Sequence, residues 1–180
     1  MDAAVPQPVL FREVALVRRG PKRLPKIYLH SMPARFESWE QFLSACKDHQ
    51  IGHILCLTSV SEIALKSPVY ANAIATHTLG VKLSIIEVKD FSTPQHLIHY
   101  QSVLKALLVL LEQSQWQRGA VQPNNLLIHC AAGIGRTGCA AICLLKELGL
   151  DNDEAKSLVL QAGSGPETPE QDQFVNDYTP

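Results

Sequence analysis

The segment His129–Gly138 combines residue types that can carry out nucleophilic chemistry on an anion. Cys130 is followed by five small or apolar residues and then by Arg136 and a hydroxyl. The apolar run 125–128 before the segment predicts a buried strand, and the apolar run 138–145 after it predicts a helix. A cysteine between a strand and a helix lies where backbone N–H groups can bind an anion, and this setting favours the thiolate. Thiolate, anion-binding loop and guanidinium together indicate covalent phosphoryl transfer.

The same segment predicts how a phosphate group would be held. Small residues and glycine allow backbone N–H groups to surround the phosphate oxygens. A guanidinium at Arg136 can bind two of those oxygens as a fork, which an ammonium group cannot do. Cys130 would then attack phosphorus in line. The phosphate-binding residues expected beside Arg136 are Ala131, Ala132, Gly133, Ile134 and Gly135.

The leaving oxygen needs a proton, so a carboxylic acid should face the loop. Asp90 is the main candidate, because it lies between a predicted strand and a predicted helix in a loop that could close over a substrate. The alternative interpretation is an exposed turn aspartate. Caps and surface positions account for the other candidates, which are Asp48, Asp151, Asp153 and Asp177.

Strands and helices are predicted to alternate along the chain. Predicted strands cover 9–17, 27–29, 52–57, 81–88 and 125–128. Predicted helices begin at the cap Ser38, run over 59–77 with a break near Ser67–Pro68, run from Thr93–Pro94 to about Gln115, and begin again at Asp151 and Thr168. This alternation predicts an α/β fold with a central, mainly parallel sheet flanked by helices and the phosphate loop between a strand and a helix. We expect a domain over 27–180 and an N-terminal extension, 1–26, packed on it.

Composition bounds the class of protein. The 180 residues carry a net charge of −1, so nucleic acid is not the expected partner. The five cysteines are an odd number without framework spacing, which favours a reducing compartment. No secretory leader is apparent and no apolar run is long enough to span a bilayer, so we expect a cytoplasmic location without membrane insertion. The basic residues of 18–26 fit a solvated hairpin connection better than a docking patch.

The loop resembles H-C-x5-R-[ST], the active-site motif of the cysteine-dependent protein tyrosine phosphatase superfamily, and matches it at every defining position. Further similarity over 27–178 is to the dual-specificity branch, most of all to its kinase-associated phosphatase and Cdc14-like members. The segments that carry this similarity are 31–33, 56–58, 90–94 and 163–171. The resemblance implies a phosphorylated protein as substrate and no cofactor. Strict phosphotyrosine specificity and dual specificity both stay open, and the sequence predicts no oligomeric state.

The resemblance also implies roles for single residues. His129 would orient the loop, Thr137 would donate to the thiolate, and Asp90 would be the general acid. Gln171 matches a glutamine that positions the hydrolytic water in some members, although it could simply belong to a capping box. Cys56 matches a cysteine that could form a disulfide with Cys130; the alternative is a buried strand residue that packs as a small hydrophobe.

Three other functions compete with a protein phosphatase. A phosphoinositide or other small phosphomonoester phosphatase would share the mechanism, but the loop lacks the lysines that extra phosphates favour. A phosphoprotein-binding module would have lost the nucleophile, the arginine or the acid, and a sulfurtransferase loop would lack the hydroxyl after arginine. We predict no metal site, because Cys139 and Cys143 lie in an apolar helix and the histidines of 96–99 have no further ligands nearby.

Overall fold

The structure is a computed structural model that describes residues 10–16, 25–113 and 124–180. One sheet has the strand order β1-β2-β5-β3-β4, in which β1 is antiparallel to β2 and the other pairs are parallel. The strands are β1 Arg12–Val14, β2 Ile27–His30, β3 Ile51–Cys56, β4 Lys82–Ile85 and β5 Asn125–His129. The predicted α/β fold with a mainly parallel sheet is therefore confirmed.

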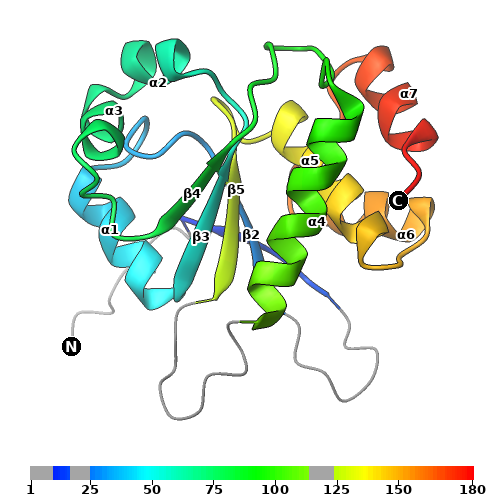
Figure 1. Ribbon diagram of the computed structural model, residues 1–180, viewed down its shortest axis with the longest axis horizontal. Helices are drawn as coiled ribbons and strands as arrows, with labels where there is room; N and C mark the ends of the chain where they lie inside the picture. The colour runs from blue at the N-terminus through cyan, green and yellow to red at the C-terminus, as the bar shows by residue number, and fades with distance from the viewer. Residues whose placement is uncertain (1–9, 17–24, 114–123) are drawn as a thin grey trace, which may run out of the picture.

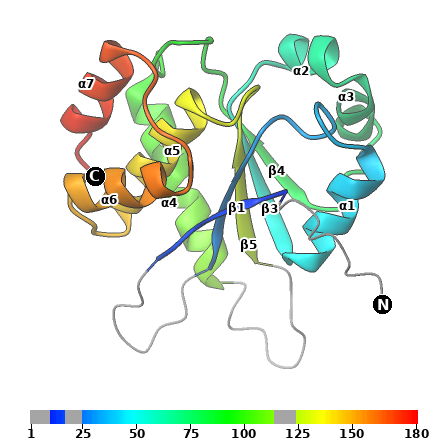
Figure 2. The ribbon, with the colours of Figure 1, turned by 180° about the vertical axis from the view of Figure 1, so that it is seen from behind.

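Helices cover both faces of this sheet (Figures 1 and 2). The first group is α1 Trp39–Asp48, α2 Val60–Lys66 and α3 Pro68–Ala75, and the second is α4 Leu97–Gln113, α5 Gly135–Glu147, α6 Asn152–Gln161 and α7 Pro169–Asp177. Side chains of a strand alternate between the faces. Leu127 of β5 packs in the core under the first group, whereas Leu126 and Ile128 pack under the second. Two cores thus hold the strand that leads into the phosphate loop.

Side-chain caps begin several helices where the sequence predicted them. Ser38 Oγ accepts a hydrogen bond from Gln41 N, and Gln41 Oε1 accepts one from Ser38 N, which completes the predicted capping box of α1. Asp151 caps α6 and Thr168 caps α7. Each cap binds an N–H group that the first helical turn cannot pair, so short polar residues determine where these helices start.

Three predicted boundaries were wrong. The helix expected from Thr93–Pro94 begins at Leu97, and its first turn lies beyond the strand ends (Figure 1). Leu97, in that first turn, is 45% exposed. The first and fourth strands are shorter than expected, at Arg12–Val14 and Lys82–Ile85, although Ile86 N still donates to the Cys56 carbonyl beyond the end of β4.

Some predictions fall outside the described residues. These are most of the basic stretch, the first residues of the extension 1–26 and the end of the long helix near Gln115. The division into 1–26 and 27–180 stays a prediction, although β1 pairs with β2 in the common sheet.

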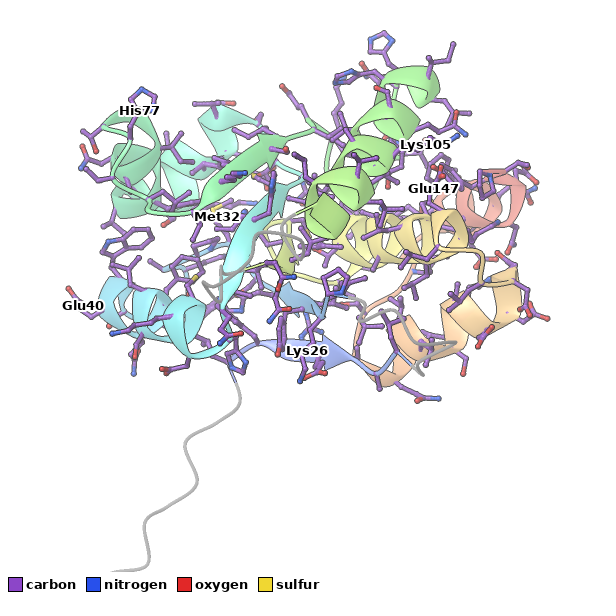
Figure 3. All side chains as sticks on the ribbon, turned by 60° about the horizontal axis from the view of Figure 1, so that its bottom comes forward. Lys26, Met32, Glu40, His77, Lys105 and Glu147 are labelled. Carbon is purple, nitrogen blue, oxygen red and sulfur yellow. The ribbon has the colours of Figure 1, made fainter. Side chains whose placement is uncertain are left out.

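Figure 3 shows how side chains fill the layers. Met32 is fully buried, whereas Glu40 and His77 lie at the periphery. Lys105 of α4 and Glu147 of α5 lie close together, with their charged atoms 3.9 Å apart, and Tyr178 donates a hydrogen bond to Glu147 at 2.6 Å. These contacts join the helices on the side of the sheet where α5 leaves the phosphate loop.

Candidate active site

The loop that follows β5 places Cys130 at the carboxyl end of a central strand. Cys130 is 3% exposed, and Gly133 N donates a hydrogen bond to its Sγ at 3.2 Å. Gly133 has a φ of +78°, and an added Cβ would lie 2.3 Å from the carbonyl oxygen of His30. Only glycine fits this position, because the loop backbone passes directly against the end of β2. The close approach keeps the N–H group of Gly133 directed at the sulfur.

His129 supports the loop from the core. Its Nδ1 is 3.1 Å from the Cys130 carbonyl oxygen, and its Nε2 is 3.0 Å from the Tyr70 hydroxyl. A carbonyl oxygen only accepts, so Nδ1 carries the hydrogen and Tyr70 donates to Nε2. Burial lowers the pKa of His129 to about 4. The imidazole is therefore neutral at pH 7 and can orient the loop without transferring protons.

The Arg136 guanidinium is buried at the start of α5, with 2% of its side chain exposed. It donates to the two carboxylate oxygens of Glu62 at 2.8 and 3.1 Å and to the Val88 carbonyl at 3.0 Å. The hydrogen bonds from Arg136 are the main reason that the pKa of Glu62 falls to about 2. The sequence analysis missed Glu62, since its position three residues after the cap Ser59 is fully explained as part of a helix start.

Asp90 lies beside this guanidinium. Its Oδ1 is 2.9 Å from Arg136 Nη2, while 52% of its side chain remains exposed. Phe91, which follows, has a φ of 55° and an exposed ring. Asp90 therefore contacts Arg136 of the loop on one side and the solvent on the other. The competing Asp151 instead caps α6, and Asp177 accepts hydrogen bonds from Gln173.

Thr137 lies one residue after Arg136 and is fully buried. Its hydroxyl oxygen has no hydrogen-bond partner among the residues that the structure describes. The resemblance predicts that this hydroxyl donates to the thiolate of Cys130, and the described residues do not form that hydrogen bond. A buried hydroxyl without a partner is costly. A rearrangement of the loop that gave the Thr137 hydroxyl an acceptor would therefore be favourable.

Gln171 and Glu167 bring the α6–α7 connection to the loop. Gln171 is fully buried; its Nε2 donates to the Ser92 carbonyl at 3.1 Å, and its Oε1 accepts from Glu167 N at 2.8 Å. Gln171 thus links the Asp90 loop to the segment before α7. Glu167 Oε2 accepts a hydrogen bond from Gly135 N at 2.8 Å, so a carboxylate occupies one of the N–H groups that were predicted to bind phosphate. No sequence signal distinguishes Glu167 from an ordinary acidic residue just before a helix cap.

Cys56 ends β3 directly beside His129 of β5, one residue from the nucleophile. It is a fully buried free thiol, its Sγ is 3.2 Å from the Thr58 hydroxyl, and burial raises its pKa. Its pairing with Cys130 stays a prediction. Cys139 and Cys143 pack in the core, and both histidines of 96–99 are exposed.

Within 10–16, 25–113 and 124–180, no group of three or more His, Cys, Asp or Glu side chains is arranged to hold a metal ion. The helices in these ranges are all too short or too polar to cross a bilayer.

The fold and the loop together define a cysteine-dependent phosphatase. Residues 26–174 match the family model described as "Swiss Army Knife protein, DSP-PTPase phosphatase domain", and the chain belongs to this family of dual-specificity-type phosphatases. A search of curated proteins found no match.

Solved structures share the fold at low sequence identity. The kinase associated phosphatase (KAP) is 15% identical, with a TM-score of 0.69 and 85% of each chain covered. Tk-PTP in its active form is 18% identical, with a TM-score of 0.67 and coverage of 94% of this chain and 95% of that one. PTPMT1 in complex with PI(5)P is 13% identical, with a TM-score of 0.62 and coverage of 84% and 88%. The protein is a phosphatase of the tyrosine and dual-specificity class and acts on a phosphorylated substrate.

Proposed function

We propose that the protein hydrolyses phosphotyrosine in phosphorylated proteins, and phosphoserine or phosphothreonine where the pocket accepts them, through a phosphocysteine intermediate. The observation that carries the proposal is the ion pair of the Asp90 carboxylate with the Arg136 guanidinium at 2.9 Å, on a guanidinium that also interacts with the charge of Cys130. The phosphoryl group, nucleophile and proton donor would therefore come together at one point.

In the first step, the Cys130 thiolate would attack phosphorus and form the S–P bond as the P–O bond to the leaving group breaks. Asp90, protonated, would give its proton to the leaving oxygen. In the second step, water would give a proton to Asp90 and attack phosphorus, the S–P bond would break, and inorganic phosphate and the thiolate would be released. Arg136 would stabilise the charge on the phosphate oxygens in both steps.

Gln171 supports this scheme in a way that differs from the role implied by the resemblance. Both ends of its amide bind backbone groups, at Ser92 and at Glu167. Water-positioning would require one of these hydrogen bonds to open after the first step. We propose that Gln171 holds the Asp90 loop against the phosphate loop while substrate binds, and becomes available to water when the leaving group departs.

Phosphate release from three substrates tests the proposal: a phosphotyrosyl peptide, a phosphothreonyl peptide and a phosphoinositide. The variant Cys130→Ser is the blank, and Asp90→Asn tests the acid. Peptide turnover that disappears in Cys130→Ser, with trapping of labelled phosphate on the wild-type cysteine after acid quench, supports the mechanism. Turnover confined to the phosphoinositide would replace the substrate class. A folded protein that binds phosphopeptides without turnover would be a binding module instead.

A further inference from the structure

Arg12 extends from the edge strand β1 to the back of the phosphate loop. Its Nη2 donates to the Gly133 carbonyl, and its Nη1 donates to the Gly163 carbonyl and, at 3.2 Å, to the Ala162 carbonyl. One half-buried guanidinium therefore joins the first strand, the phosphate loop and the connection between α6 and α7. None of these contacts was predicted from the sequence.

The Gly133 carbonyl is held by a second donor as well. The buried Ser164 hydroxyl donates to the same oxygen at 2.6 Å. In a trans peptide the carbonyl and the next N–H point in opposite directions. A carbonyl directed outward to Arg12 and Ser164 therefore turns the Ile134 N–H toward the inside of the loop, where a phosphate oxygen would bind. The orientation of this donor thus depends on the two side chains behind the loop.

Arg12 and Arg136 differ in whether neighbouring carboxylates of the described residues offset their charge. Arg136 is paired with Glu62 and Asp90. Arg12 forms no ion pair with a carboxylate of the described residues, and its three partners are neutral carbonyl oxygens. Burial lowers the pKa of Arg12, and the nearby Cys130 charge opposes that effect. Arg12 is therefore a cation near the nucleophile whose charge no described acidic partner offsets.

Several other charged or titratable groups surround Cys130, and each must be considered. Arg136 is the other cation, but two carboxylates offset it; His129 is neutral because it is buried; and Cys139 is a buried thiol whose raised pKa keeps it protonated. The groups are Arg136 and Cys139 of α5, His129 of β5, Glu62 of α2, Asp90 in the loop before α4 and Glu167 in the loop before α7. Because Glu62 and Asp90 offset the charge of Arg136, Arg12 contributes a large part of the remaining positive charge around Cys130.

We propose that Arg12 is a positioning residue of the active site, which fixes the outward Gly133 carbonyl and supplies the positive charge that favours the Cys130 thiolate. The inference rests on the proposed function, because it assigns a support to the same nucleophile. It makes the first strand part of the catalytic apparatus rather than an edge of the sheet alone.

The pH dependence of Cys130 alkylation by iodoacetamide tests the charge effect, with mass spectrometry of the Cys130 peptide as readout. We expect the midpoint of the rate profile to rise by about one pH unit in Arg12→Met, since the lost charge binds the carbonyl of Gly133, the residue whose N–H binds the sulfur. Arg12→Lys should keep the midpoint near that of wild type but lose about tenfold in kcat, because one ammonium cannot bridge both segments. Lys26→Met is the matched control, since it removes an exposed cation that pairs with Glu13 on β1.

A pair of glycine variants keeps the test decisive if Arg12→Met fails to fold. Gly163 has a φ of +73°, and an added Cβ would lie 3.2 Å from Arg12 Nη1. Gly149 has a φ of +89° with nothing within 4 Å of such a Cβ. Both alanine variants carry backbone strain, but only in Gly163→Ala must the Arg12 guanidinium give way, by a few tenths of an ångström. We expect a small rise of the alkylation midpoint in Gly163→Ala and no rise in Gly149→Ala.

Two results would overturn the inference: an unchanged midpoint in folded Arg12→Met, or equal midpoints in the two glycine variants. Because alkylation needs no substrate, these results are independent of turnover. A chain that hydrolyses none of the tested phosphomonoesters but still shows the midpoint change would refute the proposed function and leave the role of Arg12 standing.

Discussion

Replacing Glu62 by glutamine removes the carboxylate that holds the Arg136 guanidinium. A pKa lowered from 4.5 to about 2 corresponds to about 3 kcal/mol of favourable interaction with the charged form. Arg136 is the largest cause of that effect, burial opposes it and Lys66 adds to it, and the Glu62 side chain is 17% exposed, so solvent screens part of it. About 2 kcal/mol remains for the pair with Arg136. If all of it serves to orient the guanidinium in the transition state, Glu62→Gln lowers kcat by about thirtyfold.

Steady-state kinetics on a phosphotyrosyl peptide can separate orientation from charge. Glu62→Gln leaves Arg136 with one carboxylate fewer, so the phosphate dianion should bind at least as well, and KM should stay level or fall while kcat drops. Lys66→Gln is the matched control, because Lys66 contacts Glu62 at 2.6 Å and the variant keeps the pair with Arg136. A wild-type kcat in Glu62→Gln, or an equal loss in Lys66→Gln, would refute the reasoning.

Three further predictions follow from the described contacts. The folded-state pKa of His129, about 4, lies below its ordinary value of 6.5, so the unfolded chain binds the extra proton and stability is lost as the pH falls from 6.5 toward 4. Because burial lowers the pKa of His53 to about 4 as well, urea titrations should show a loss in wild type that is about 3 kcal/mol larger than the loss in His129→Gln, with His99→Gln like wild type. Gly133→Ala, whose Cβ would meet backbone at 2.3 Å, should lose at least a hundredfold in kcat/KM yet retain its circular dichroism spectrum; near-normal turnover would contradict the described loop. Glu167→Gln removes a negative charge from Gly135 N and should tighten vanadate binding about threefold to tenfold; weaker binding would mean that the carboxylate supports the loop instead.

Local patterns predicted much of this molecule, and long-range contacts account for what they missed. Cys130, Arg136 and the flanking strand and helix are adjacent in sequence, so their spacing alone indicates the chemistry. Asp90 was predicted because a strand end before a helix is a local feature. Glu62 and Arg12, in contrast, reach the site across 74 and 121 residues of chain. Their sequence neighbourhoods describe a helix start and an edge strand, and neither pattern indicates a partner.

The limits of helix and strand prediction have a related cause. The caps at Ser38, Asp151 and Thr168 act within one helical turn, and the helices begin beside them. The pair Thr93–Pro94 has the same local chemistry, but α4 begins only at Leu97. The buried Gln171 binds the carbonyl of Ser92 and so holds that segment in the Asp90 loop instead. A tertiary hydrogen bond of this kind leaves no periodic signal in the sequence.

The strand order determines how independently the two halves of the site can fluctuate. β5, which leads to Cys130, has hydrogen-bonded neighbours on both sides, whereas β4, which leads toward Asp90, is an edge strand. Amide protons of β5 should exchange with solvent only when the sheet unfolds as a whole, and those around Asp90 through small local openings. Cys130 thus follows a strand that opens only with the whole domain, while the Asp90 loop can open and close at a small fraction of that free energy.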